Sequence, residues 1–142
     1  MRVITKISII RQTDLCPDLS YLGKYSSDYT RGAVDRKAVG DMRRDEYQYF
    51  IPANDSGIWD DYRRYEEYNN GQWTILYIYA EALIRLSNGS MTIRSNGIGG
   101  VESDGDYENI ENEVLSDLKT ILVEEGFGVK EIEDIEVKKV DK

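Results

Sequence analysis

The segment 72–95 constrains the fold more than any other part of the chain, because its pattern is that of two strands joined by a tight turn. From Leu76 to Leu86 every second residue is apolar, which is the period of a strand with one buried face. Asn88-Gly89 follows, and this dipeptide favours the type I′ turn of a two-residue hairpin. The residues after the turn are expected to return antiparallel. The sequence therefore predicts a central β-hairpin over residues 72–95.

Two helices are predicted beside this hairpin. Residues 56–69 place apolar and aromatic side chains at helical spacing, and Gly71 is suited to close the helix. Residues 106–125 build a second apolar face with the same period, ended by Gly126. Alternating apolar residues over 2–11 predict a further strand. The sequence thus predicts an α+β fold in which an antiparallel sheet is packed by the two helices.

The remaining segments give weaker patterns. Residues 12–45 lack strong periodicity and are expected to form a long irregular connection, with a short strand near 46–51. The glycine-rich stretch 96–106 is expected to link the hairpin to the second helix, and a last strand is expected at about 130–139. No internal repeat or domain boundary interrupts the chain. We therefore expect a single globular domain over residues 1–142.

The excess negative charge lies entirely in the C-terminal part. Residues 1–101 carry 13 basic and 13 acidic side chains, whereas residues 102–142 carry 5 basic and 14 acidic ones, which accounts for the net charge of −9. An acidic C-terminal part beside an otherwise neutral chain attracts cationic partners and repels the phosphates of nucleic acid. The charge distribution therefore favours a protein partner, and nucleic acid is not expected.

The second predicted helix arranges part of this charge as a stripe. Four of its acidic side chains fall within a narrow arc beside the apolar face. Glu113 and Asp117 form a like-charge pair at i,i+4, which costs about 0.2–0.5 kcal/mol in an isolated helix. The simpler interpretation is a solvated face, and the alternative is a stripe that docks on a basic groove of another protein. The candidate partner-binding residues are Asp104, Asp106, Glu113, Asp117 and Glu124.

A second candidate surface lies in the tyrosine- and arginine-rich stretch 21–49. Tyrosine and arginine together are typical of recognition surfaces, and they could also clamp single-stranded nucleic acid. Acidic residues interspersed through this stretch argue against a strong positive potential there. The residues of this alternative surface are Tyr25, Tyr29, Arg43, Arg44 and Tyr47.

Composition removes several enzyme classes. The chain has no histidine, which excludes the usual serine-protease and papain-like sites and the zinc-peptidase motifs, and it has no P-loop sequence. The acidic residues of loop 102–108 could offer oxygen ligands to a hard cation, but their spacing is not that of a calcium loop. We therefore expect a protein that is not an enzyme and has no cofactor or metal. A metal-dependent enzyme built on loop 102–108 is an alternative.

The expected location is the bacterial cytoplasm. No apolar run reaches the ~18 residues of a membrane span, so no membrane partner is expected. The N-terminus alternates apolar and polar residues instead of forming a signal-peptide core. Cys16 is the single cysteine, so no internal disulfide can form, which fits a reducing compartment.

Short motifs along the chain carry a resemblance. They include Tyr21-Leu22-Gly23-Lys24-Tyr25, Glu46-Tyr47-Gln48-Tyr49-Phe50, the run from Asp61-Tyr62-Arg63-Arg64 to Asn69-Asn70-Gly71-Gln72-Trp73, and Val101-Glu102-Ser103-Asp104. Over roughly residues 15–127 the chain resembles a family of small uncharacterised proteins of bacteriophages and other mobile elements. The motifs bring no established chemistry with them. In one departure, Gly99 stands where the resemblance leads us to expect a tryptophan.

The resemblance implies a setting for the acidic stripe. Small acidic phage proteins often bind host or defence proteins, so it implies an accessory protein that inhibits a host nucleic-acid-directed defence, in the style of anti-CRISPR and anti-restriction proteins. The expected partner is a host or defence protein with a basic nucleic-acid-binding groove, in which the acidic helix takes the place of DNA phosphates. The alternative is a small nucleic-acid-binding accessory protein that uses region 21–49.

Overall fold

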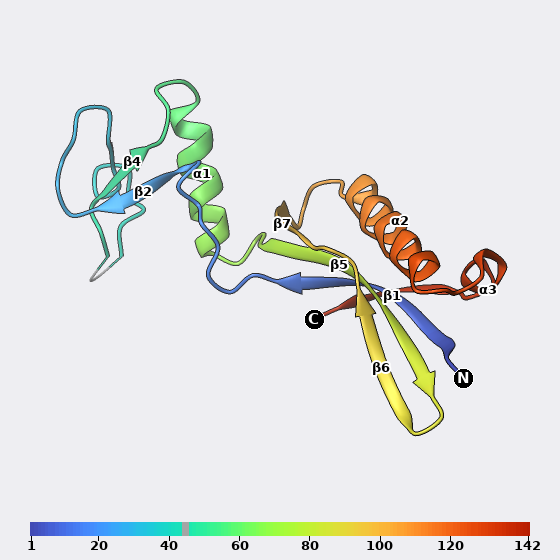
Figure 1. Ribbon diagram of the computed structural model, residues 1–142. Coiled ribbons are helices and arrows are strands. Elements are labelled where there is room, and N and C mark those ends of the chain that lie inside the picture. Colours follow the sequence, from blue (N-terminus) through green and yellow to red (C-terminus); the bar gives the residue numbers. More distant parts are fainter. Residues whose placement is uncertain (44–45) are drawn as a thin grey trace. The chain divides into compact units, whose positions relative to one another are not determined.

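The computed structural model describes residues 1–43 and 46–142, and the contacts of the chain gather into two compact units (Figure 1). The sheet unit comprises residues 1–15 and 74–142, and the inserted unit comprises residues 16–73. The expected single domain over residues 1–142 stays a prediction, and the mixture of helices and strands confirms the α+β class.

The sheet unit consists of five strands and two helices (Figure 1). The strands are β1 (Val3–Thr13), β5 (Ile75–Leu86), β6 (Gly89–Arg94), β7 (Ile98–Glu102) and β8 (Val137–Asp141), and the helices are α2 (Glu108–Glu124) and α3 (Val129–Glu133). The strand order is β6-β5-β1-β8, and β7 also pairs with β5. The predicted hairpin is confirmed, because β5 and β6 pair antiparallel with Leu86 opposite Gly89. Its two-residue loop is Ser87-Asn88 and not the expected Asn88-Gly89, because Gly89 is already the first paired residue of β6.

One strand pairing corrects the expected antiparallel sheet. β8 lies parallel to β1, with Ile7 opposite Val137. Both β1 and β7 run antiparallel to β5, so β7 and β8 run in the same direction. A chain that re-enters a sheet in the same direction needs a crossover connection, and α2 and α3 form it. The sheet is therefore mixed, and the segment expected to be a strand at 130–139 forms α3 followed by β8.

The core of the sheet unit lies between this crossover and the sheet. The even-numbered apolar residues of β5 are buried there, as the alternation predicts. In β1 a register irregularity between Ile4 and Lys6 brings Ile4 to the same face as Ile7 and Ile9. Strict alternation along β1 would place Ile4 on the face opposite to Ile7 and Ile9. The helix side of this core is formed by the buried residues Val114, Leu118 and Leu122 of α2.

The glycine-rich stretch after the hairpin is a strand and not the expected link. β7 pairs antiparallel with β5, with Ile98 opposite Ile78. Just before β7, a Cβ atom at Gly97 would lie 2.0 Å from the ring of Tyr77. A glycine there lets the aromatic ring lie directly on the backbone. The pairing of β7 fixes the position of Ile98, which lines the candidate site.

The inserted unit has its own small sheet and helix. Its strands are β2 (Gly23–Ser26), β3 (Val34–Asp35) and β4 (Tyr49–Pro52), in the order β2-β4-β3, and its helix is α1 (Ile58–Asn69). Val34, Phe50 and Tyr62 form its buried cluster. The predicted helix 56–69 is confirmed as α1, and within the inserted unit it packs on this small sheet. The expected irregular stretch 12–45 contains two of the short strands.

Candidate functional site

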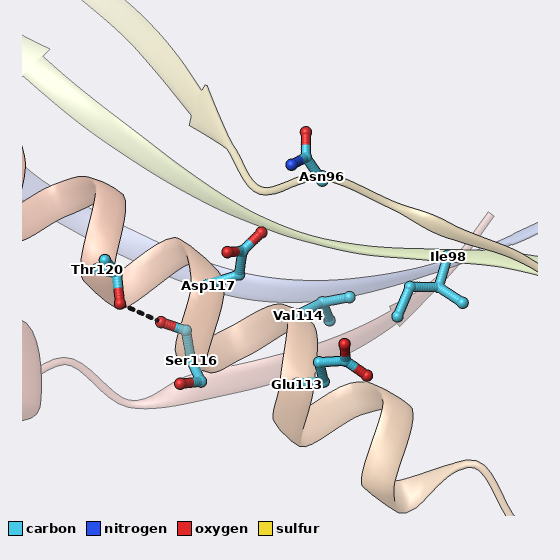
Figure 2. A pocket seen from close by; sticks show the side chains of 7 residues that line it. All are labelled: Asn96, Ile98, Glu113, Val114, Ser116, Asp117 and Thr120. Atoms are coloured by element: carbon cyan, nitrogen blue, oxygen red, sulfur yellow. Dashed lines mark hydrogen bonds between the residues drawn. The ribbon is translucent and has the colours of Figure 1, made fainter.

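The exposed side of α2 and the chain entering β7 enclose a groove of about 480 Å³ (Figure 2). The hydroxyl of Thr120 donates a hydrogen bond to the carbonyl of Ser116 at 3.1 Å, so this hydroxyl proton is already used within the helix. The groove combines helix side chains with two residues of the opposite wall. Its lining residues are Asn96, Ile98, Glu113, Val114, Ser116, Asp117 and Thr120.

The rotation of α2 places Glu113 and Asp117 in this groove. Val114 and Leu118 are buried against the sheet, and each acidic residue precedes one of them by a single position, about 100° around the helix. The two carboxyl groups therefore lie at the flank of the buried face, one turn apart. Figure 2 shows both side chains projecting from α2 on the side where Asn96 and Ile98 lie.

Within residues 1–43 and 46–142, these two carboxylates have no compensating cation. Among the residues that the structure describes, neither Glu113 nor Asp117 forms an ion pair or a side-chain hydrogen bond, and no Lys or Arg lines the groove. Glu111, on the buried side of the same helix, instead accepts a hydrogen bond from the Lys139 ammonium group at 3.1 Å. The groove therefore holds two negative charges that are neutralised by nothing described in the chain.

The other predicted acidic residues lie elsewhere. Asp104 lies in the turn before α2 and Asp106 at the start of the helix, where its Oδ1 accepts the backbone N–H of Glu108 at 3.1 Å. This contact suits a helix N-terminus, where the first N–H groups lack helical partners. Glu124 lines a second groove, between α2 and α3. The structure brings Glu113 and Asp117 together and leaves the other three at separate places.

The neutral residues of the groove were not predicted from the sequence. Asn96 and Ile98 form its far wall, and they belong to a stretch that was expected to be a link. Ser116 and Thr120 could have been found, because they lie one turn apart on the same helix face as Asp117. No local pattern indicated the far wall, since it depends on the pairing of β7 with β5.

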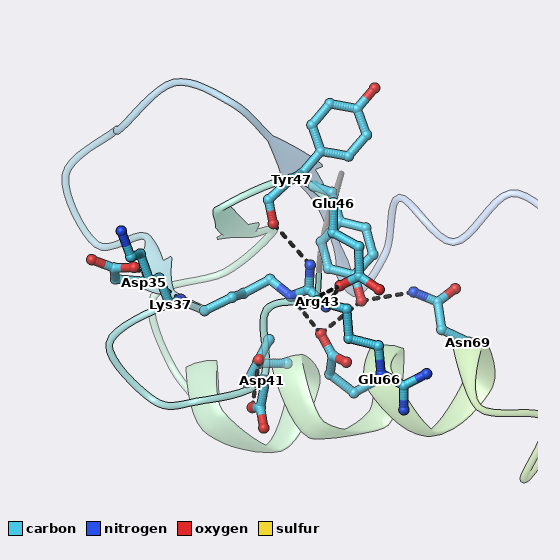
Figure 3. Close-up of polar contacts among 11 residues, drawn as sticks. Asp35, Lys37, Asp41, Arg43, Glu46, Tyr47, Glu66 and Asn69 are labelled. Atoms are coloured by element: carbon cyan, nitrogen blue, oxygen red, sulfur yellow. Dashed lines mark hydrogen bonds and ion pairs between the residues drawn. The ribbon is translucent and has the colours of Figure 1, made fainter.

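The inserted unit contains a buried polar cluster that the sequence also did not reveal (Figure 3). Only 3% of Arg36 is exposed. Its Nε donates to Glu66, its Nη2 to Glu46 and its Nη1 to the carbonyl of Tyr47, each at 2.8 Å. The guanidinium carbon lies 4.4 Å from the centre of the Tyr25 ring. Three separate segments, around residues 21–25, 46–50 and 61–73, thus meet at one arginine.

The protonation states of this cluster follow from its contacts. Burial opposes the charge of Arg36, but its hydrogen bonds to Glu66 and Glu46 outweigh that effect and raise its pKa above the ordinary value. Burial, followed by the hydrogen bond to Glu66, raises the pKa of Tyr25 far above 10. A backbone N–H of Arg43, and then Arg36, hold the pKa of Glu46 below its usual value. The cluster is internally satisfied, with a charged arginine and a neutral tyrosine.

The alternative Tyr/Arg surface is divided by this arrangement. Tyr25 is held inside the cluster, where its hydroxyl donates to Glu66 at 2.8 Å and accepts from Asn69 at 2.7 Å. Tyr29 and Tyr47 are exposed. Arg43 lines a polar pocket of about 410 Å³ that also contains the carboxylates of Asp41, Glu46 and Glu66. Arg44 lies outside the described residues.

The acidic loop 102–108 does not gather into an evident ligand set. Glu102 ends β7, Glu108 begins α2, and Asp106 is engaged at the helix start. Within residues 1–43 and 46–142, no group of three or more Asp, Glu, Cys or His side chains is arranged to hold a metal ion. No observation therefore favours the metal-dependent alternative over the groove on α2.

The chain matches no model of a known protein family, no curated protein and no solved structure. Its resemblance to phage and mobile-element proteins therefore stays a prediction. In the described part of the chain, no helix has the length and apolar character needed to cross a membrane.

Proposed function

We propose that the protein acts by binding, and that the groove on α2 accepts a cationic surface of another protein. The observation that carries this proposal is the pair of carboxylates, Glu113 and Asp117, in a groove without a lining cation. The surrounding charge adds to their attraction, because the sheet unit carries 16 acidic and 10 basic side chains. A field of this sign steers cationic partners toward the groove and keeps anionic ones away.

The proposed partner is a host protein directed at nucleic acid, with a basic groove that the acidic helix enters. Carboxylates at positions i and i+4 are separated by about 6 Å along a helix axis. Neighbouring phosphates on one strand of DNA are spaced about 3.4 Å along the duplex axis and lie farther apart in space, because they are also rotated around that axis, so the separation of Glu113 and Asp117 is of the same order as one phosphate step. Occupation of the basic groove by α2 would exclude nucleic acid and inhibit the partner. The resemblance to phage and mobile-element proteins supports this class of partner.

The proposed interaction is electrostatic, so its affinity should depend on the charges of the groove and on the salt concentration. Exposed ion pairs each contribute about 0.2–1 kcal/mol and are screened by salt. Reversing the two charges converts attraction into repulsion, which we expect to weaken binding by at least about tenfold at low salt. The same binding should weaken as the salt concentration rises.

A pull-down from a host lysate with matched charge variants tests the proposal. The tagged native protein is compared with the double variant Glu113→Lys/Asp117→Lys. The control, Asp134→Lys/Glu136→Lys, makes the same change of net charge at exposed positions outside both grooves.

We expect the native protein and the control to recover a nuclease or another nucleic-acid-directed protein, and the groove variant to lose it. The purified partner should then be inhibited by the native protein, and salt should relieve the inhibition. Equal recovery by all three proteins would exclude the groove as the binding site. Enrichment of nucleic acid without a protein would instead support the nucleic-acid-binding alternative.

A further inference from the structure

We propose that the second groove, between α2 and α3, anchors an apolar side chain of the same partner, so that the recognised segment carries a large aliphatic or aromatic residue beside its basic residues. This inference rests on the proposed function and adds the chemistry of the partner segment. The second groove has a volume of about 510 Å³. Its lining residues are Ser116, Lys119, Thr120, Val123, Glu124, Val129, Ile132 and Glu133.

The two grooves are continuous along the exposed side of α2. Ser116 and Thr120 line both of them. Their side chains are small, and the Thr120 hydroxyl is turned back onto the helix backbone. We infer that these two residues form only a shallow boundary between the grooves. One segment of a partner can therefore lie across both.

The second groove is the more apolar of the two. Val123 near the end of α2 is 46% exposed, and Val129 at the start of α3 is 58% exposed. Single exposed apolar residues are ordinary, but these two line the same groove together with the buried Ile132. Concave apolar sites of this kind are where binding partners place their anchoring side chains. The groove thus offers an aliphatic lining to a side chain inserted from outside.

The charges along both grooves specify the rest of the segment. The second groove carries Glu124 and Glu133 against Lys119, and the first carries Glu113 and Asp117 without a cation. An acidic segment would meet repulsion in both grooves, whereas a purely basic one would leave the two valines uncovered. A basic segment with one apolar anchor matches both grooves.

The helix geometry sets the spacing within that segment. Asp117 and Val123 are six residues apart, about 9 Å along the axis of α2. An extended peptide covers this distance in about three residues, since it advances about 3.3 Å per residue. Asp117 and Val123 also lie about 120° apart around the helix, so the anchor and the basic side chain should be separated by at least about three positions in an extended segment.

Two labelled synthetic peptides test this inference by fluorescence anisotropy. One is an arginine-rich peptide with a single leucine three positions from a pair of arginines, and the other has alanine in place of the leucine. The protein variants are Val123→Ser/Val129→Ser, which keeps the charge, and Glu113→Lys/Asp117→Lys. Leu83→Ser serves as the control, because Leu83 is an exposed apolar residue on the opposite face of the sheet.

We expect the native protein and Leu83→Ser to bind the leucine peptide about tenfold more tightly than the alanine peptide. The valine variant should lose this preference and still bind both peptides, and the charge variant should lose affinity for both. If the native protein binds the two peptides equally, or binds neither at low salt, the second groove does not anchor an apolar side chain and the inference is wrong. The proposed function is decided separately by the lysate experiment, which needs no anchor.

Discussion

Replacement of Arg36 by methionine should lower the free energy of unfolding of the inserted unit by about 3 kcal/mol. Methionine has a similar length but no charge or N–H donor. The carboxylates of Glu66 and Glu46 would lose their cation, and the carbonyl of Tyr47 would lose its donor. Removing one partner leaves the others desolvated and uncompensated, which is the main cause of the loss.

The magnitude follows from the exposure of the two carboxylates. Breaking a buried ion pair by deleting one partner costs about 3–5 kcal/mol. The side chain of Glu66 is 18% exposed, so it stays largely desolvated, whereas that of Glu46 is 36% exposed and regains hydration. The lower end of the range therefore applies. A loss of about 3 kcal/mol changes the unfolding equilibrium by roughly two orders of magnitude.

Urea unfolding followed by tryptophan fluorescence measures this loss. The two tryptophans of the chain, Trp59 and Trp73, both belong to the inserted unit, so the signal reports on that unit. Arg31→Met removes the same charge from an exposed position and should change stability by less than about 0.5 kcal/mol.

A double variant separates the ion pair from simple packing. Arg36→Met/Glu66→Gln removes both charges and should recover part of the loss, because no buried carboxylate is left uncompensated. A loss below about 1 kcal/mol for Arg36→Met alone, similar to that of the exposed control, would refute the reasoning.

Four further outcomes follow from the same contacts. Gly23→Ala should destabilise the inserted unit by more than about 2 kcal/mol in the fluorescence assay, because at φ +148° the new Cβ atom would lie 2.5 Å from the buried ring of Phe50 and 2.4 Å from a backbone carbonyl. Leu118→Ala should cost the sheet unit about 2–5 kcal/mol, seen as faster hydrogen exchange of the α2 amides, because the side chain is fully buried. Hydrogen bonds from a backbone N–H and then a guanidinium lower the pKa of Glu46 from 4.5. The ionised Glu46 carboxylate therefore contributes fully to the stability of the folded state above about pH 4.5, and this contribution is lost as the pH falls. The variant Glu46→Gln should flatten this part of the pH profile of urea unfolding. Burial raises the pKa of Tyr25 above 10.0. The neutral Tyr25 hydroxyl therefore contributes fully to the stability of the folded state below pH 10, and this contribution is lost as the pH rises further. The variant Tyr25→Phe should remove this loss of stability at alkaline pH.

Elements whose signals are local can be predicted from the amino-acid sequence. The alternation up to Leu86 and the turn signal at Asn88-Gly89 predict the β5–β6 hairpin, and the structure has this hairpin, although its two-residue loop is Ser87-Asn88, one position earlier than the expected turn. The 3.6-residue period of apolar side chains predicts α1 and α2 to within two residues at each end. Periodicity and turn chemistry depend on residues close together in the chain, so they can be read without the fold.

The sequence determined half of the candidate site. The spacing of Glu113 and Asp117 puts them one turn apart on α2, and the buried positions beside them fix which way they face. It did not indicate the far wall at Asn96 and Ile98, because that wall exists only where β7 pairs with β5. The neighbouring groove likewise depends on how α3 packs beside α2.

The pairing of distant segments cannot be predicted from local patterns and becomes visible only in the folded chain. Ile7 pairs with Val137 across 130 residues of chain, and nothing in either short strand specifies that partner or its parallel direction. Arg36 lies in a stretch without periodicity, so its burial could not be read from spacing. A charged residue is buried only where other segments supply its acceptors, and those acceptors, Glu46 and Glu66, come from two separate parts of the chain.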